Sequence, residues 1–169
     1  MADELARLLQ KTIDTELPHL QRLTEDASRI KPQGETSWSP KEELGHLIDS
    51  ATNNHQRIMR AALEQEYRGP GYAQNDWVSM NGYQKTPWRN IVSLWYEYNC
   101  LLVRAVGNVP ENKLTTPCFI GSAAEPVTLD FVIEDYVLHT RHHIDHLLRR
   151  QSVTPYPGTP QKSPAGGVR

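Results

Sequence analysis

The sequence predicts an all-α protein, namely a four-helix bundle with long crossover connections and a flexible C-terminal tail. Three observations favour this class. Apolar residues recur at helical spacing in four separate segments. The segments between them are long, whereas simple up-and-down bundles usually have short loops. The end of the chain is rich in Pro and Gly and has no apolar periodicity.

The first predicted helix covers about residues 3–30, where Leu and Ile recur every three or four positions. Pro18 lies inside it and predicts either a kink or a junction between two helices. The second predicted helix begins after Ser39 and runs to about residue 66. Ser39 is its N-cap, a proline follows in the first turn, and Glu42 completes a capping box.

The third predicted helix begins after its cap, Thr86, and ends near Gly107. The fourth has Thr128 as its cap and reaches about residue 150. We expect the connections 67–86 and 108–127 to be irregular, and a short strand pair in the second is the less favoured alternative. The bundle domain is expected to span residues 1–152, followed by a mobile tail over residues 153–169.

Composition restricts the classes of partner. A chain of 169 residues fits one domain, and its formal net charge of −2 gives no electrostatic reason to expect nucleic acid or a membrane as partner. No run of about 20 apolar residues suits a membrane span. We expect the acidic, amphipathic N-terminus to be a helix of the mature protein, not a signal peptide, and the cytoplasm to be the location. Cys100 and Cys118 are expected to be buried free thiols.

The stretch HTRHHIDH, residues 139–146, contains four histidines on one predicted helix. Relative to His139, a helix places His143 at roughly +40°, His146 at −20° and His142 at −60°, while the apolar residues centre at roughly +110°. His139 and His143 are therefore the most inward pair, one turn apart. That spacing suits two ligands of one metal ion, and a histidine-rich polar helix face is the alternative interpretation.

A metal site needs at least one more protein ligand, and helical phase leaves it open. On the second predicted helix, His55 lies within the apolar face, whereas His46 lies roughly 165° from its centre. His46 shares its face with polar residues, including Ser50 and Arg57. Periodicity alone would bury His55, but a polar face that lines a solvated metal pocket would give the same pattern for His46.

Three segments resemble the DinB/YfiT-like superfamily. The segment TSWSPKEELGHLIDS (36–50) is similar to its second-helix motif, and VTLDFVIEDYVLHTRHHIDHLLR (127–149) is similar to its last-helix motif. The segment PWRNIVSLWYEYNCLLVRAVGNVPENKLTTP (87–117) resembles its third helix and the loop that follows. The likeness covers about residues 5–150.

This resemblance implies a four-helix bundle, a homodimer, and one divalent metal ion per chain. The metal would be nickel or zinc, with iron or manganese as alternatives, held by His46, His139 and His143; His55 is the alternative third ligand. Three imidazoles leave an open position for water or a thiolate, as in catalytic sites. Asp49, Asp135 and Asp145 are candidate partners that orient the histidines, or else solvated helix charges.

The resemblance implies three possible functions, each with a small-molecule substrate. The first is a transferase that conjugates a low-molecular-weight thiol, such as bacillithiol, mycothiol or glutathione, to an electrophile. The second is a metal-dependent hydrolase that uses metal-bound water. The third is a non-catalytic dimeric stress or binding protein whose metal is structural.

Overall fold

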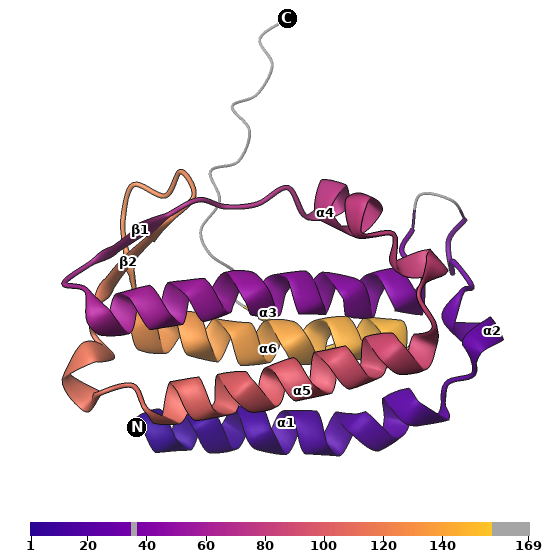
Figure 1. Cartoon of the computed structure of the whole chain (residues 1–169), viewed down its shortest axis with the longest axis horizontal. Coiled ribbons are helices and arrows are strands. Elements are labelled where there is room, and N and C mark those ends of the chain that lie inside the picture. Colours follow the sequence, from indigo (N-terminus) through magenta and orange to yellow (C-terminus); the bar gives the residue numbers. More distant parts are fainter. Residues whose placement is uncertain (35–36, 157–169) are drawn as a thin grey trace, which may run out of the picture.

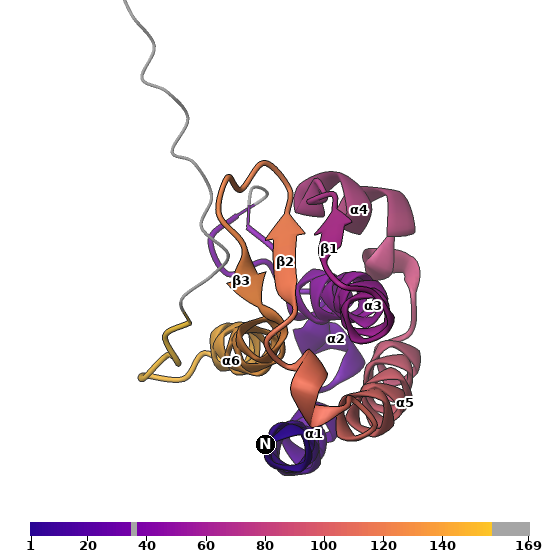
Figure 2. The same ribbon diagram turned by 90° about the vertical axis from the view of Figure 1, so that its left-hand side faces the viewer.

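The computed structural model describes residues 1–34 and 37–156. Four long helices form the bundle: α1 (Ala2–Arg22), α3 (Pro40–Leu63), α5 (Trp88–Gly107) and α6 (Leu129–Leu147). In Figure 1, α1 and α6 run in one direction, and α3 and α5 run in the other. Figures 1 and 2 show that α1 and α3 lie diagonally opposite each other, and that α5 and α6 each pack against both. The predicted four-helix bundle is confirmed. Within the described residues, no helix is long and apolar enough to cross a membrane.

The first helical segment is shorter than the sequence pattern predicts. Helix α1 continues through Pro18 but ends at Arg22, and the next residue has an extended backbone. Thr24 then caps a new single turn, α2 (Glu25–Ser28), by accepting a hydrogen bond from the backbone N–H of Ala27 at 3.2 Å. The prediction of one helix over residues 3–30 is therefore wrong beyond residue 22, because apolar spacing continues across this break and the chain becomes helical again only at Glu25–Ser28.

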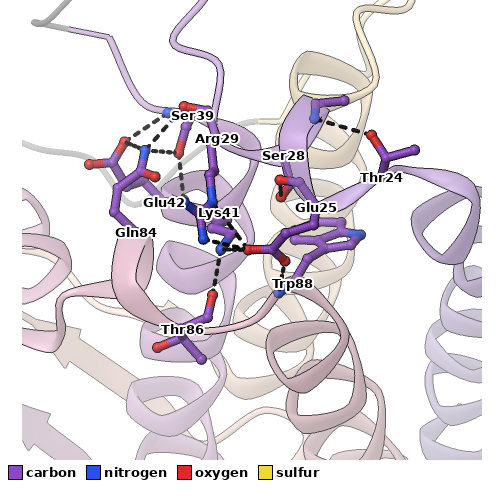
Figure 3. A network of polar contacts seen from close by, with 11 residues as sticks. Thr24, Glu25, Ser28, Arg29, Ser39, Lys41, Glu42, Gln84, Thr86 and Trp88 are labelled. Atoms are coloured by element: carbon purple, nitrogen blue, oxygen red, sulfur yellow. Dashed lines mark hydrogen bonds and ion pairs between the residues drawn. The ribbon is translucent and has the colours of Figure 1, made fainter.

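Helix α3 begins as predicted, with a complete capping box between Ser39 and Glu42. A buried lysine fixes this end of the bundle. Lys41 is 0% exposed, and its ammonium group donates to Glu25 of α2 at 2.5 Å and to the carbonyl of Thr86 at 2.6 Å. Glu25 also accepts from the backbone N–H of Trp88, so the network in Figure 3 joins α2, α3 and the start of α5.

Both long connections contain regular structure, contrary to expectation. The first contains β1 (Tyr67–Gly69), α4 (Gln74–Asn81) and the 3₁₀ turn η1 (Tyr83–Lys85). The second contains the turn η2 (Glu111–Lys113) and the strands β2 (Pro117–Ile120) and β3 (Val127–Thr128). Strand β2 pairs with β1 in parallel and with β3 in antiparallel orientation. Figure 2 shows this small sheet lying over α3 and α6, on the side away from α1.

The core lies between the four long helices and contains Trp95, Tyr136 and many aliphatic side chains. The hydroxyl of Tyr136 donates to Asn99 of α5 at 2.5 Å, so one polar bond crosses the core between α6 and α5. Both cysteines are free, as expected, with Cys118 buried and Cys100 partly exposed. Of the predicted tail, residues 157–169 lie outside the described residues.

Candidate metal centre

Three histidines from two neighbouring helices meet in the structure. His46 comes from the second turn of α3, and His139 and His143 come from successive turns of α6. One nitrogen of each ring lies within 4.8 Å of the others, and Nε2 of His46 is 3.2 Å from Nε2 of His139. The structure thus brings together the three residues that the family motif implies as ligands.

A carboxylate fixes the orientation of His143. Nδ1 of His143 lies 2.5 Å from Oε1 of Glu43, one turn before His46 on α3. A proton on Nδ1 would be donated to this carboxylate, which leaves the Nε2 lone pair available to a metal. His139 has a polar neighbour at the corresponding nitrogen, but the contact is longer: the hydroxyl of Ser50 lies 3.4 Å from Nδ1 of His139.

His46 is 1% exposed, contrary to the helical-phase prediction of a surface residue. The polar face of α3 is covered by the connections: Trp38 packs on the His46 ring at 4.9 Å between centroids, and Tyr72 stacks at 6.4 Å. His55, the alternative third ligand, lies elsewhere and pairs through Nδ1 with the hydroxyl of Tyr98 at 3.0 Å. The structure therefore brings His46, not His55, to the other two histidines.

The site favours neutral imidazoles, the form that binds metals. Burial, together with the nearby His143, lowers the pKa of His46 to about 3. Burial also lowers the pKa of His139 well below its ordinary value, and the neighbouring histidines add to that effect. Two of the three rings thus present lone pairs at neutral pH without first losing a proton.

A cavity of about 880 Å³ adjoins the histidine cluster at His139 and lies beneath the two connections. Its wall contains His139 and Tyr136 of α6, Ser50, Asn54 and Arg57 of α3, and residues 71–76 and 120–123 of the connections. Burial raises the pKa of Tyr72, on this wall, to about 12, so its hydroxyl stays protonated at neutral pH. The volume lies near the upper end of the range for small-molecule sites, about 300–1,000 Å³.

The structure gives other partners to two of the three carboxylates considered as histidine partners. Asp49 accepts hydrogen bonds from the hydroxyl of Tyr83 at 2.7 Å and from Asn81 at 2.8 Å. Asp145 accepts from Arg150 and from the backbone and hydroxyl of Thr154. Asp135 lines the cavity beside His139. Glu43 is a carboxylate that does contact a histidine of the cluster, namely His143.

The first residues of the predicted tail pack against α6. The carbonyl of Thr154 accepts a hydrogen bond from Nδ1 of His142 at 2.7 Å. Tyr156 lines the cavity, with its ring centroid 5.1 Å from that of His139 and 4.8 Å from that of His142. Tyr156 thus contributes to the wall of the site, and His142 holds its segment from outside the three-histidine cluster.

Sequence reasoning missed Glu43 and Tyr156. A usable signal for Glu43 was its position three residues before His46, which puts both on one helix face. Tyr156 carried no such signal, because it lies in a segment with Pro and Gly and no periodicity. Its place depends on the Asp145–Thr154 contacts, which join residues nine apart.

The donor set fits a divalent transition metal. With metal–nitrogen bonds of about 2.0–2.1 Å, two ligands of a tetrahedral ion lie roughly 3.3 Å apart, close to the 3.2 Å between the two Nε2 atoms. Nδ1 of His46 is buried and has no hydrogen-bond partner among the described residues. Imidazole ligands suit zinc, nickel, copper and iron better than magnesium or calcium.

The fold is similar to that of a solved protein. The structure of YfiT from Bacillus subtilis, a probable metal-dependent hydrolase with an unusual four-helix bundle topology, superimposes with a TM-score of 0.77. The match covers 89% of this chain and 86% of that one, at 19% sequence identity. No protein-family model matches the sequence, and no curated protein matches it either. The resemblance to the DinB/YfiT-like fold is thereby confirmed.

Proposed function

We propose that this protein is a metal-dependent enzyme of the DinB/YfiT-like type, in which His46, His139 and His143 hold one divalent ion. The observation that carries the proposal is the convergence of three imidazoles beside a cavity large enough for a small molecule. A structural metal site is usually closed by four protein ligands, whereas three ligands leave a position for substrate. Here the described residues supply three.

The chemistry that we favour is hydrolysis of a small molecule. A divalent ion in this site would lower the pKa of a coordinated water and polarise a substrate carbonyl or phosphoryl group. Glu43 keeps the Nδ1 proton of His143, which orients the ring and raises its basicity as a ligand. Ser50 and Tyr72 offer hydroxyl groups along the cavity wall for binding a polar substrate. The description of YfiT as a probable metal-dependent hydrolase also supports this reaction.

Transfer of a low-molecular-weight thiol to an electrophile is the second candidate. It is favoured by the size of the cavity, because about 880 Å³ lies near the upper end of the range for small-molecule sites and gives room for a thiol and a second small reactant. The two reactions are separated by one measurement, the dependence of turnover on added thiol. Hydrolysis proceeds without a thiol, whereas transfer stops when the thiol is omitted.

Metal analysis of the protein tests the common part of both candidates. We expect about one zinc or nickel ion per chain, and a loss of metal in His46→Ala and His143→Ala. His55→Ala is the matched control, because His55 lies on the same helix as His46 but pairs with Tyr98. Turnover should disappear on chelation and return on adding the metal. Metal-free protein whose stability does not respond to added zinc or nickel would contradict the proposal.

A further inference from the structure

Arg57 is a buried cation on the wall of the cavity. It lies on α3, is 8% exposed, and lines the cavity together with His139. It stands eleven residues after His46, which is three turns of helix and almost the same direction around the axis. The same face of α3 therefore carries a candidate metal ligand near its start and Arg57 near its end, with their Cα atoms roughly 16 Å apart along the axis.

Arg57 has little to balance its charge. Its Nη1 donates a hydrogen bond to the amide oxygen of Asn54 at 3.3 Å, and the part of the chain that the structure describes offers it no ion pair. Arg150 differs: its side chain is 33% exposed, yet it pairs with Glu16 at 2.6 Å and with Asp145 at 2.8 Å. The more buried arginine is thus the one without a carboxylate.

A buried guanidinium group has five N–H donors, and burial of a charge without a counter-ion is costly. Arg57 uses one donor on a neutral acceptor, so several remain for a ligand in the cavity. The carboxylates that line the same cavity, Asp76 and Asp135, form no ion pair with Arg57 in the described structure. Asp76 is exposed on α4. The planar fork of arginine matches the geometry of a carboxylate or a phosphate.

We propose that Arg57 binds an oxyanion group of the substrate, a carboxylate or a phosphate, while the reacting bond of that substrate lies at the three histidines. This inference rests on the proposed function, because it takes the cavity to be the substrate site. The inference limits the class of substrate to small anionic molecules whose charged group is separated from the reacting atoms. Arg57 is then a binding and specificity residue, which touches the substrate and takes no part in proton transfer.

Binding of simple anions to the full-length protein tests this inference. The probes are glutarate, its neutral analogue glutaramide, and inorganic phosphate, titrated by calorimetry into the protein as isolated and after metal removal. We expect glutarate or phosphate to bind in both forms and glutaramide not to bind. A preference for glutarate assigns the group as a carboxylate, and a preference for phosphate assigns it as a phosphate.

Arg57→Gln should weaken anion binding by roughly tenfold or more, because charge-assisted hydrogen bonds are lost. Arg60→Gln is the matched control, since it removes the same charge from an exposed position on the same helix. Equal anion affinity in the two variants would overturn the inference. Should Arg57→Gln fail to fold, the Nε–Hε resonance of Arg57 in the wild-type protein decides: a saturable shift with the anion supports the inference, and an unmoved resonance overturns it.

The outcomes for Arg57 and for the metal are separate. Anion binding that depends on Arg57 in a protein without metal affinity would support the subsite and contradict the proposed enzyme. A protein that binds metal through the histidines, but binds anions equally well with and without Arg57, would support the proposed metal site and contradict the anion subsite. Metal content of Arg57→Gln is measured beside wild type, and we expect it to be unchanged because Arg57 lies outside the histidine cluster.

Discussion

Glu43 and His143 form a contact of 2.5 Å between the first turns of α3 and the C-terminal half of α6. The two residues stand 100 positions apart in the chain. This pair links the two helices that carry the histidine cluster, and it fixes which nitrogen of His143 faces the other rings.

We expect Glu43→Gln to lower metal affinity by about 10–100-fold, the usual effect of removing the partner of a metal-ligating histidine. The amide keeps the size of the side chain but loses the charge that favours a proton on Nδ1. The measurement is competition with a chromophoric chelator. Glu134→Gln, an exposed carboxylate on α6, is the control. Equal affinity in the two variants would show that Glu43 plays no part in metal binding.

The metal-free protein should lose stability in acid. Burial holds the pKa of His46 at about 3, below its ordinary 6.5. Between these values the unfolded chain takes up a proton that the folded protein excludes, so the stability is complete above about pH 6.5 and falls as the pH decreases. His46 alone changes the free energy of unfolding by at most about 1.4 kcal/mol per pH unit. Urea unfolding at several pH values measures how steeply the free energy of unfolding depends on pH. This dependence should be weaker in His46→Gln and unchanged in His19→Gln, which replaces an exposed histidine.

Gly45→Ala should destabilise the protein and disturb the site. A Cβ atom at Gly45 would lie 2.1 Å from the ring of Tyr83, which must then move and release its hydrogen bond to Asp49. Overpacking of this kind costs about 1–3 kcal/mol. Gly107→Ala is the control, because its Cβ would meet only Ala6 at 3.6 Å. Thermal unfolding should show a lower Tm for Gly45→Ala. For Gly107→Ala we expect an unchanged or higher Tm, because alanine has a higher helix propensity than glycine.

Lys41→Met should destabilise the protein by about 1.5–3 kcal/mol, the range for hydrogen bonds to a charged group. Lys41 is fully buried, and without it the carbonyl of Thr86 loses its partner. Arg29→Met removes another cation from the same Glu25, but from an exposed position, and should have a much smaller effect. Denaturant unfolding compares the two. Equal losses would mean that burial of Lys41 contributes nothing.

The two cysteines should differ in reactivity. Burial raises the pKa of the Cys118 thiol to about 11, so little thiolate forms at neutral pH, and the residue is also inaccessible. Cys100 is partly exposed on α5. Iodoacetamide at pH 8 should therefore modify Cys100 first, as read by mass spectrometry of peptides. Preferential modification of Cys118 in the folded protein would contradict its burial.

The parts of the fold that depend on local chemistry were predictable. Ser39 and Glu42 mark the start of α3 because a capping box is a short-range device, and the structure contains it. The end of α1 was missed because apolar spacing persists beyond Arg22, while the break depends on the cap at Thr24. The strands were underestimated because each has only two to four residues, and because β1 pairs with β2, which lies far along the chain.

Helical phase predicted some residues of the candidate site and not others. The pair His139 and His143 followed from spacing on one helix. His46 did not, since phase analysis assumes one buried face per helix, and α3 is buried on a second face by connections that sequence periodicity cannot place. Its recognition came from the family motif. Arg57, on that same polar face, was visible in the sequence, but its burial was not.

The 3.2 Å contact between His46 and His139 also has a consequence for folding. The two residues are 93 positions apart, and α5 with both connections lies between them. Bringing such distant segments together has an entropic cost that rises with loop length, so contacts of this kind tend to form after local helices. A bound ion would then act as a removable cross-link around most of the bundle. Metal uptake during refolding should follow helix formation and report completion of the tertiary structure.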